Sequence, residues 1–248
     1  MREREVELAT RDGRMPTFIT HPEEGGPHPT VIFFMDALGI RDELREMARR
    51  IGTAGYYVML ANLFYRAGGP SFDPALLPTQ GPDPEMMRLN MATTHAMVLA
   101  DTEAMLRFAA NDPAARDPVG AIGYCMGGRH AYAAAGRFPE RIAAMASLHA
   151  GFQVTGWPDS AYLLTRHIKA ECYFGFADDD PLSPPEHQRI IAEECARWGV
   201  PHRLEAYRGA KHGFTFPERY CYDKPSAERA WERVFALFER HLRRSLTA

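Results

Sequence analysis

A six-residue run places a cysteine where a strand is expected to turn sharply into a helix. The run Gly123-Tyr124-Cys125-Met126-Gly127-Gly128 follows an apolar stretch at 119–122 and precedes a helix-forming stretch at 129–135. In a nucleophile elbow the reactive side chain occupies a tight turn, and small residues two positions to either side let the two backbones approach. Free N–H groups and the positive end of the helix dipole favour a thiolate there. The pattern predicts a nucleophilic Cys125; the alternative is a buried structural cysteine beside a glycine-rich turn.

The remaining chain alternates between strand and helix signals. Apolar runs predict strands at 30–35, 56–61, 119–122, 142–148, 172–176 and 203–207, and periodicity predicts helices at 42–51, 86–110, 129–135, 185–198 and 227–244. Residues 5–9 and 15–20 flank Asp12-Gly13, a hairpin turn pair. This order predicts an α/β protein with a mostly parallel twisted sheet, an N-terminal antiparallel hairpin and helices on both faces. We expect the α/β-hydrolase architecture in one domain over residues 1–248.

Composition narrows the classes of partner and compartment. Net charge is −3, from 29 basic and 32 acidic residues, and there is no basic block, so we expect no nucleic-acid partner. No apolar run approaches the roughly 18 residues that span a membrane. The charged start at residues 1–5 lacks a secretory apolar region, which favours the cytoplasm. Four cysteines without a CxxC pair suggest neither a disulfide framework nor a metal site.

A thiol nucleophile needs a base, and in this architecture the order along the chain is nucleophile, acid, histidine. His212 lies in the loop 209–214, directly after the last predicted strand. Loops at the carboxyl ends of parallel strands assemble the site in such sheets. We therefore expect His212 to be the base. His187, His202 and His241 fall within or beside predicted elements and are expected on the surface or in packing.

Three consecutive aspartates are candidates for the acid that orients this histidine. Asp178, Asp179 and Asp180 all follow the strand that ends near Phe176. Asp180 precedes Pro181 and is therefore expected in a turn, which favours it, with Asp178 as the competitor. Only one of the three is needed to accept the Nδ1 hydrogen bond and fix the tautomer. The others, or all three, would be solvated turn residues.

Taken together, these motifs resemble the dienelactone hydrolase family. The resemblance rests on the cysteine elbow at 123–128, on Asp180 followed four residues later by Pro184, and on Ala210-Lys211-His212-Gly213-Phe214. Asp36-Ala37-Leu38-Gly39 and Leu63-Phe64-Tyr65-Arg66 extend it over nearly the whole chain.

The resemblance implies a hydrolase that needs no cofactor. It maps a catalytic triad onto Cys125, Asp180 and His212, and an oxyanion hole onto the backbone N–H groups of Ala37 and Met126. The implied reaction is hydrolysis of a small carboxylic ester or lactone, of carboxymethylenebutenolidase type, through an acyl-enzyme, by a monomer or small homo-oligomer. The alternatives are a thioesterase or general carboxylesterase with the same triad, and a catalytically silent scaffold that binds a ligand or partner protein.

The sequence departs from the family at two places. Where the family has a glutamate that helps to ionise the resting thiol, this chain has Asp36, one methylene shorter. Either the backbone sits closer here, or activation differs, or Asp36 closes a turn. The family's arginines hold a substrate carboxylate; the nearest counterparts are Arg88 and Arg219, which do not fall at the family's spacing. Because an arginine clamp depends on position, we expect an uncharged substrate to be preferred.

Further candidates for the pocket lie just beyond predicted strands or beside His212. These are Tyr65, Arg66, His149 and Phe214, of which His149 is expected to be a non-catalytic wall. Residues 62–84 are rich in Pro and Gly and show little periodicity. Long loops of this kind in compact domains are often functional, so this segment is expected to be either a lid or substrate-binding loop, or a solvated crossover.

Overall fold

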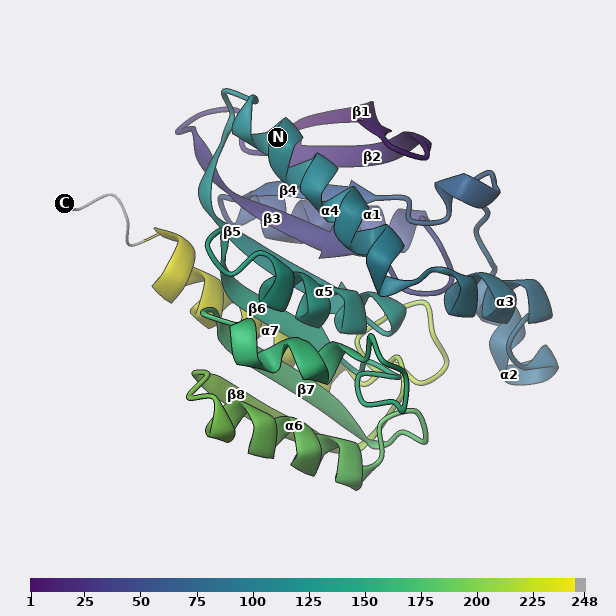
Figure 1. Ribbon diagram of the computed structural model, residues 1–248. Helices are drawn as coiled ribbons and strands as arrows, with labels where there is room; N and C mark the ends of the chain where they lie inside the picture. The colour runs from purple at the N-terminus through teal and green to yellow at the C-terminus, as the bar shows by residue number, and fades with distance from the viewer. Residues whose placement is uncertain (244–248) are drawn as a thin grey trace.

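A computed structural model describes residues 1–243 (Figure 1). One eight-stranded sheet has the order β1-β2-β4-β3-β5-β6-β7-β8. Its strands are β1 (Arg2–Thr10), β2 (Gly13–His21), β3 (His28–Phe34), β4 (Tyr57–Ala61), β5 (Ala115–Tyr124), β6 (Ile142–Leu148), β7 (Glu171–Asp179) and β8 (His202–Lys211). The β1–β2 and β2–β4 pairs are antiparallel and all others are parallel. The predicted α/β-hydrolase architecture is confirmed.

Helices cover both faces of this sheet. They are α1 (Asp42–Thr53), α2 (Leu77–Gln80), α3 (Pro84–Ala92), α4 (His95–Ala110), α5 (Met126–Arg137), α6 (Pro185–Arg197) and α7 (Lys224–Phe238). Figure 1 shows α4, α5 and α6 in front of the sheet and α1 and α7 behind it. Every residue of β3 is buried, as expected for a central strand that packs against helices on both sides. Because the strands from β3 to β8 run parallel to one another, their carboxyl ends share one edge of the sheet.

The long helix predicted over 86–110 is wrong, because the chain breaks it at Thr93 and Thr94. The Thr93 hydroxyl donates to the Leu89 carbonyl at 2.8 Å, and Thr94 Oγ1 accepts from the Met97 N–H at 3.3 Å. The two side chains thus satisfy backbone groups at a helix end and at a helix start. As a result α4 packs along the sheet, whereas α3 lies beyond the carboxyl ends of the strands (Figure 1).

The segment 62–84 and the last helix also differ in detail from expectation. The segment holds two short 3-10 helices, η1 (Tyr65–Ala67) and η2 (Pro74–Leu76), followed by α2. The last helix begins earlier than predicted, at Lys224, and a π-helical turn, η4 (Glu239–Arg243), follows its end at Phe238. Arg244, the predicted end, lies outside the described residues. The remaining 3-10 helix, η3 (Ala161–His167), connects β6 to β7.

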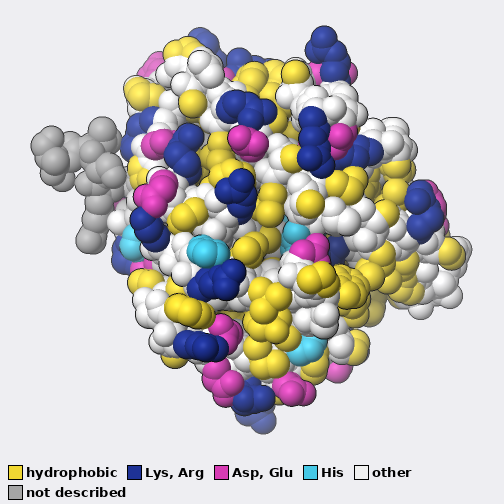
Figure 2. Space-filling model, in the orientation of Figure 1, with side chains coloured by type: hydrophobic (Ala, Val, Ile, Leu, Met, Phe, Trp, Pro, Cys, Tyr) yellow, Lys and Arg dark blue, Asp and Glu magenta, His cyan; other side chains and the backbone are white. Residues whose placement is uncertain are grey.

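The surface carries acidic and basic side chains in a mixed pattern. Figure 2 shows dark-blue and magenta groups interspersed over the face that also displays α4, α5 and α6. Among residues 1–243, no helix has both the length and the apolar character that crossing a bilayer requires.

Candidate active site

Cys125 occupies a strained turn between β5 and α5. Its backbone angles are φ 54° and ψ −119°, a conformation that L-residues rarely adopt. The flanking glycines are required by close packing: a Cβ on Gly123 would lie 2.1 Å from the Gly127 carbonyl oxygen, and one on Gly127 would lie 2.1 Å from that of Phe34. The structure thus places the thiol on an elbow of the kind that the sequence predicts, at the carboxyl edge of the sheet.

His212 and Asp180 come together from the ends of neighbouring strands. Nδ1 of His212, which follows β8, lies 2.7 Å from Oδ2 of Asp180, which follows β7. The Asp180 side chain is 0% exposed, and its Oδ1 accepts from the Leu182 N–H at 2.9 Å. Asp178 instead accepts from the Gly209 N–H and is exposed, as is Asp179. Of the three aspartates, Asp180 is therefore the one positioned to fix the His212 tautomer.

Cys125 and His212 line one cavity of about 450 Å³. Burial alone would raise the pKa of the Cys125 thiol, but the charges of His212 and Arg219 outweigh burial and lower it. Burial would likewise lower the pKa of His212, whereas the charge of Cys125 and the hydrogen bond to Asp180 raise it. These opposite shifts favour transfer of the thiol proton to the imidazole, which leaves a nucleophilic thiolate.

Asp36, two residues after β3, is held by two arginines. Arg41 donates from Nη1 to Oδ1 at 2.7 Å and from Nη2 to Oδ2 at 3.1 Å, and Arg219 donates from Nη2 to Oδ2. Oδ1 also accepts from the Leu38 N–H at 3.2 Å, so Asp36 closes a turn as well. Its side chain is 0% exposed. Asp36 and Arg219 were predicted from the sequence, but Arg41 was not, since its only signal was its place five residues after Asp36.

The two backbone amides expected to form an oxyanion hole lie on segments that touch. Ala37 lines the cavity, and Met126 is the first residue of α5. An N–H at this helix position has no partner within the helix. The contact of Gly127 with the Phe34 carbonyl brings the start of α5 against the end of β3.

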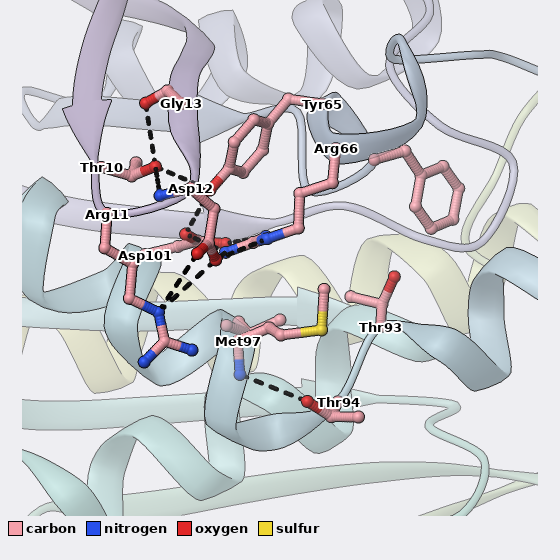
Figure 3. Close-up of polar contacts among 12 residues, drawn as sticks. Thr10, Arg11, Asp12, Gly13, Tyr65, Arg66, Thr93, Thr94, Met97 and Asp101 are labelled. Atoms are coloured by element: carbon pink, nitrogen blue, oxygen red, sulfur yellow. Dashed lines mark hydrogen bonds and ion pairs between the residues drawn. The ribbon is translucent and has the colours of Figure 1, made fainter.

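Tyr65 and Arg66 do not line the cavity, contrary to expectation. Figure 3 shows their side chains directed toward Asp101 instead. The Tyr65 hydroxyl donates to Asp101 Oδ1 at 3.0 Å. Arg66 donates from Nη1 to Asp101 Oδ2 at 2.8 Å and from Nη2 to Asp12 Oδ2 at 2.7 Å. A carboxylate on α4 and one in the β1–β2 turn thus pair with this arginine and hold it outside the site.

Three other candidates also lie off the cavity surface. Arg88 is exposed and pairs with Glu85 at 2.6 Å, within α3. His149 is fully buried behind His212, with ring centres 5.3 Å apart, and its Nε2 lies 2.7 Å from Thr215 Oγ1. Phe214 packs on His149 with ring centres 5.4 Å apart. His149 and Phe214 therefore support His212 rather than form the pocket wall.

The cavity wall itself is mostly apolar and was largely missed from the sequence. Its apolar residues are Leu38, Leu77, Pro82, Met86, Met87, Phe152, Pro181 and Leu182. Leu77 and Pro82 belong to the segment 62–84, so this segment contributes to the site and is not a purely solvated crossover. Polar wall residues include Asn90, Lys211, Arg219 and Cys221. Across residues 1–243, no three His, Cys, Asp or Glu side chains gather as metal ligands.

Comparison with known proteins identifies the family of this chain. The sequence profile of the dienelactone hydrolase family matches residues 15–242. The chain belongs to this family. The resemblance drawn from the elbow and loop motifs is thereby confirmed, and the protein is a hydrolase of the dienelactone hydrolase type.

Individual relatives share the full length of the chain. A protein of Synechocystis sp., provisionally assigned as a carboxymethylenebutenolidase, is 28% identical over 247 residues, covering 96% of each chain. A provisionally assigned dienelactone hydrolase of Klebsiella pneumoniae has a similar fold, with a TM-score of 0.86 at 21% identity over 97% of this chain and 99% of that one. A dienelactone hydrolase-like promiscuous phosphotriesterase from metagenomic libraries has a TM-score of 0.77 at 23% identity, covering 97% and 98%.

Proposed function

We propose that this protein hydrolyses a small carboxylic ester or lactone through a Cys125–His212–Asp180 triad and an acyl-enzyme. The observation that carries the proposal is the 2.7 Å contact between His212 and Asp180 beside a cysteine on a strained elbow, all on one cavity. Family membership supports hydrolysis, and the local geometry supports the thiol mechanism.

The proposed reaction has two halves. The Cys125 thiolate attacks the carbonyl carbon to form a tetrahedral intermediate, the C–O bond breaks, and the alcohol leaves with the proton held on His212. Neutral His212 then takes a proton from water, the resulting hydroxide attacks the thioester carbon, and the C–S bond breaks. The carboxylic acid departs and the thiolate is regenerated. For a lactone, the alcohol and the acid are parts of one product.

The oxyanion of each intermediate would be bound by the N–H groups of Ala37 and Met126. Donors that are already in place stabilise charge as it develops, and each is worth roughly 3 kcal/mol where such a donor has been removed. The start of α5 adds the positive end of its dipole at the same point.

An uncharged substrate fits the cavity best. The arginines predicted at or near the pocket, Arg66, Arg88 and Arg219, each pair with a carboxylate of the protein. A carboxylate brought among the apolar wall residues would lose hydration, and Arg219, the arginine that lines this wall, already pairs with Asp36. Small uncharged esters and lactones, with an apolar portion against Met86, Met87 and Phe152, avoid this cost.

The proposal is tested by a substrate screen run side by side on the wild type and on Cys125→Ala. The screen contains uncharged esters, lactones and acyl thioesters. Turnover by the wild type that disappears in a folded Cys125→Ala variant is expected. A preference for thioesters would favour the thioesterase alternative. Absence of turnover together with tight binding of a ligand would favour the catalytically silent scaffold. Hydrolysis by Cys125→Ala at the wild-type rate would contradict the thiol mechanism.

A further inference from the structure

Arg129 is a buried arginine one helical turn after the candidate nucleophile. It lies four residues beyond Cys125, within α5, and only 4% of its surface is exposed. Two residues that contact Arg129, Asn90 and Phe152, line the cavity together with Cys125. Arg129 is thus close to the cavity, next to residues that form its wall.

The contacts of Arg129 leave its charge without an acidic partner. Its Nη2 donates to the Asn90 backbone carbonyl at 2.7 Å, and the guanidinium lies 5.9 Å from the centre of the Phe152 ring. Within residues 1–243, no carboxylate lies within salt-bridge distance of it, whereas Arg41 and Arg219 both pair with Asp36. A buried cation without a counter-charge is costly, so a nearby anion in the working state would offset that cost.

The charged groups around Arg129 indicate which anion this is. Two groups could supply the negative charge, Cys125 and Asp159. Cys125 lines the same cavity as the Asn90 and Phe152 contacts of Arg129, whereas Asp159 is exposed and beyond salt-bridge distance. Burial lowers the pKa of Arg129 to about 10, so it remains a cation at neutral pH. Burial and the charge of Arg129 lower the pKa of His95 to about 4 and that of His130 further, so both imidazoles are neutral there.

The other side of Cys125 is faced by the groups already described. His212 and Arg219 favour the ionised sulfur, Asp36 opposes it, and Asp180 acts through His212. Asp36 is itself neutralised by Arg41 and Arg219. Among the described residues, Arg129 and Lys211 are the cations around this cavity that no protein carboxylate pairs with; Lys211 is exposed to solvent, whereas Arg129 is buried.

We propose that Arg129 is a positioning residue that stabilises the thiolate of Cys125 from the α5 side of the cavity. The Asn90 carbonyl and the Phe152 ring hold the guanidinium in place. The inference rests on the proposed role of Cys125 as nucleophile. In this arrangement two groups keep the Cys125 sulfur ionised: His212 and the fixed guanidinium of Arg129 on α5.

The experiment is the pH dependence of Cys125 alkylation by iodoacetamide. This reagent is uncharged, so the loss of a cation does not alter its attraction to the site. A Cys221→Ser background removes the other thiol that lines the cavity, while Cys172 and Cys195 are fully buried. Arg129→Gln and Arg129→Met are two neutral replacements of different shape, and Arg129→Lys keeps the charge.

The alkylation midpoint should rise by about one pH unit in the Gln and Met variants, which makes alkylation about tenfold slower below both midpoints. The Lys variant should stay near the wild-type midpoint. An unchanged midpoint in either neutral variant, once its fold is verified by circular dichroism, overturns the inference, as does a Lys variant that shifts as far as Gln. Alkylation requires no turnover, so this result stands apart from the substrate screen, whose failure would concern the proposed function alone.

Discussion

Arg41 binds both carboxylate oxygens of Asp36, at 2.7 and 3.1 Å, and Arg219 binds one of them from the other side. A carboxylate fixed by two cations serves here to neutralise and orient arginines. Of the readings that the sequence left open for Asp36, turn closure is observed, and the shorter side chain suits its ion pairs. The charge of Asp36 opposes ionisation of the Cys125 thiol, whereas Arg219, which Asp36 holds near the sulfur, favours it.

Asp36→Ala should destabilise the protein strongly, because it leaves buried Arg219 without its counter-charge and removes one of the two carboxylates that pair with Arg41, the other being Glu43. Removal of one partner of a buried ion pair costs about 3–5 kcal/mol. Urea unfolding would measure the loss. Arg88→Ala is the matched control, since its pair with Glu85 is exposed and such pairs contribute about 1 kcal/mol or less. Similar unfolding free energies for both variants would contradict this account.

The three aspartates after β7 should separate sharply on mutation. Asp180→Asn should lower kcat by about 10⁴-fold, as loss of the orienting carboxylate does in triads, whereas Asp178→Asn and Asp179→Asn should stay within about threefold of the wild type. Because residues of a triad act as a unit, His212→Ala combined with Asp180→Asn should be little worse than the poorer single variant. Strict additivity of the two effects, measured by steady-state kinetics, would argue against a shared triad.

The pH profile of kcat/KM should show a broad plateau. The lowered pKa of Cys125 means that the thiolate forms below the usual range of a thiol, so the rate should rise with pH through that lowered value. The raised pKa of His212 keeps the imidazolium available to protonate the alcohol, so the rate should fall only above that raised value. In His212→Ala the alkylation midpoint of Cys125 should move upward. A midpoint that stays in place would show that His212 does not stabilise the thiolate.

A carboxylate on the substrate should lower kcat/KM. For a lactone or ester and an analogue of equal size that carries a carboxylate, we expect kcat/KM to favour the uncharged compound by tenfold or more, because no free arginine among Arg66, Arg88 and Arg219 meets the acid. Steady-state kinetics on the matched pair provides the measurement. A clear preference for the acid would overturn this prediction, and the arginine whose change to Ala raises KM for the acid alone would then be the one that binds it.

Arg66→Ala should affect stability and leave substrate binding unchanged. Its partner Asp101 is fully buried and would lose its ion pair, at a cost of about 3–5 kcal/mol. KM should remain within about twofold of the wild type, because Arg66 lies outside the cavity. Thermal unfolding and kinetics on the same preparation check both statements. A large rise in KM without loss of stability would show that Arg66 contacts the substrate.

The parts of the site that could be predicted were those set by local geometry and chain order. The elbow needs its glycines, and the base must follow the last strand, so Cys125 and His212 could be located from sequence alone. Ion pairs were not predictable in this way. Arg66 follows a strand as a pocket residue would, but Asp101, thirty-five residues later, captures it. The break at Thr93 had a local signal in the Thr-Thr pair, which the apolar periodicity on both sides obscured.

The break at Thr93 separates a helix that packs on the sheet from helices that line the cavity. Helix α4 packs against the sheet, whereas α2 and α3 contribute Leu77, Met86 and Met87 to the cavity wall. The stretch 62–92 is therefore an insert between two fixed points, the end of β4 and the start of α4. Changes in its length or side chains can redirect the enzyme to new substrates while the elbow and its charge arrangement stay intact, which makes this insert the natural place to begin a redesign.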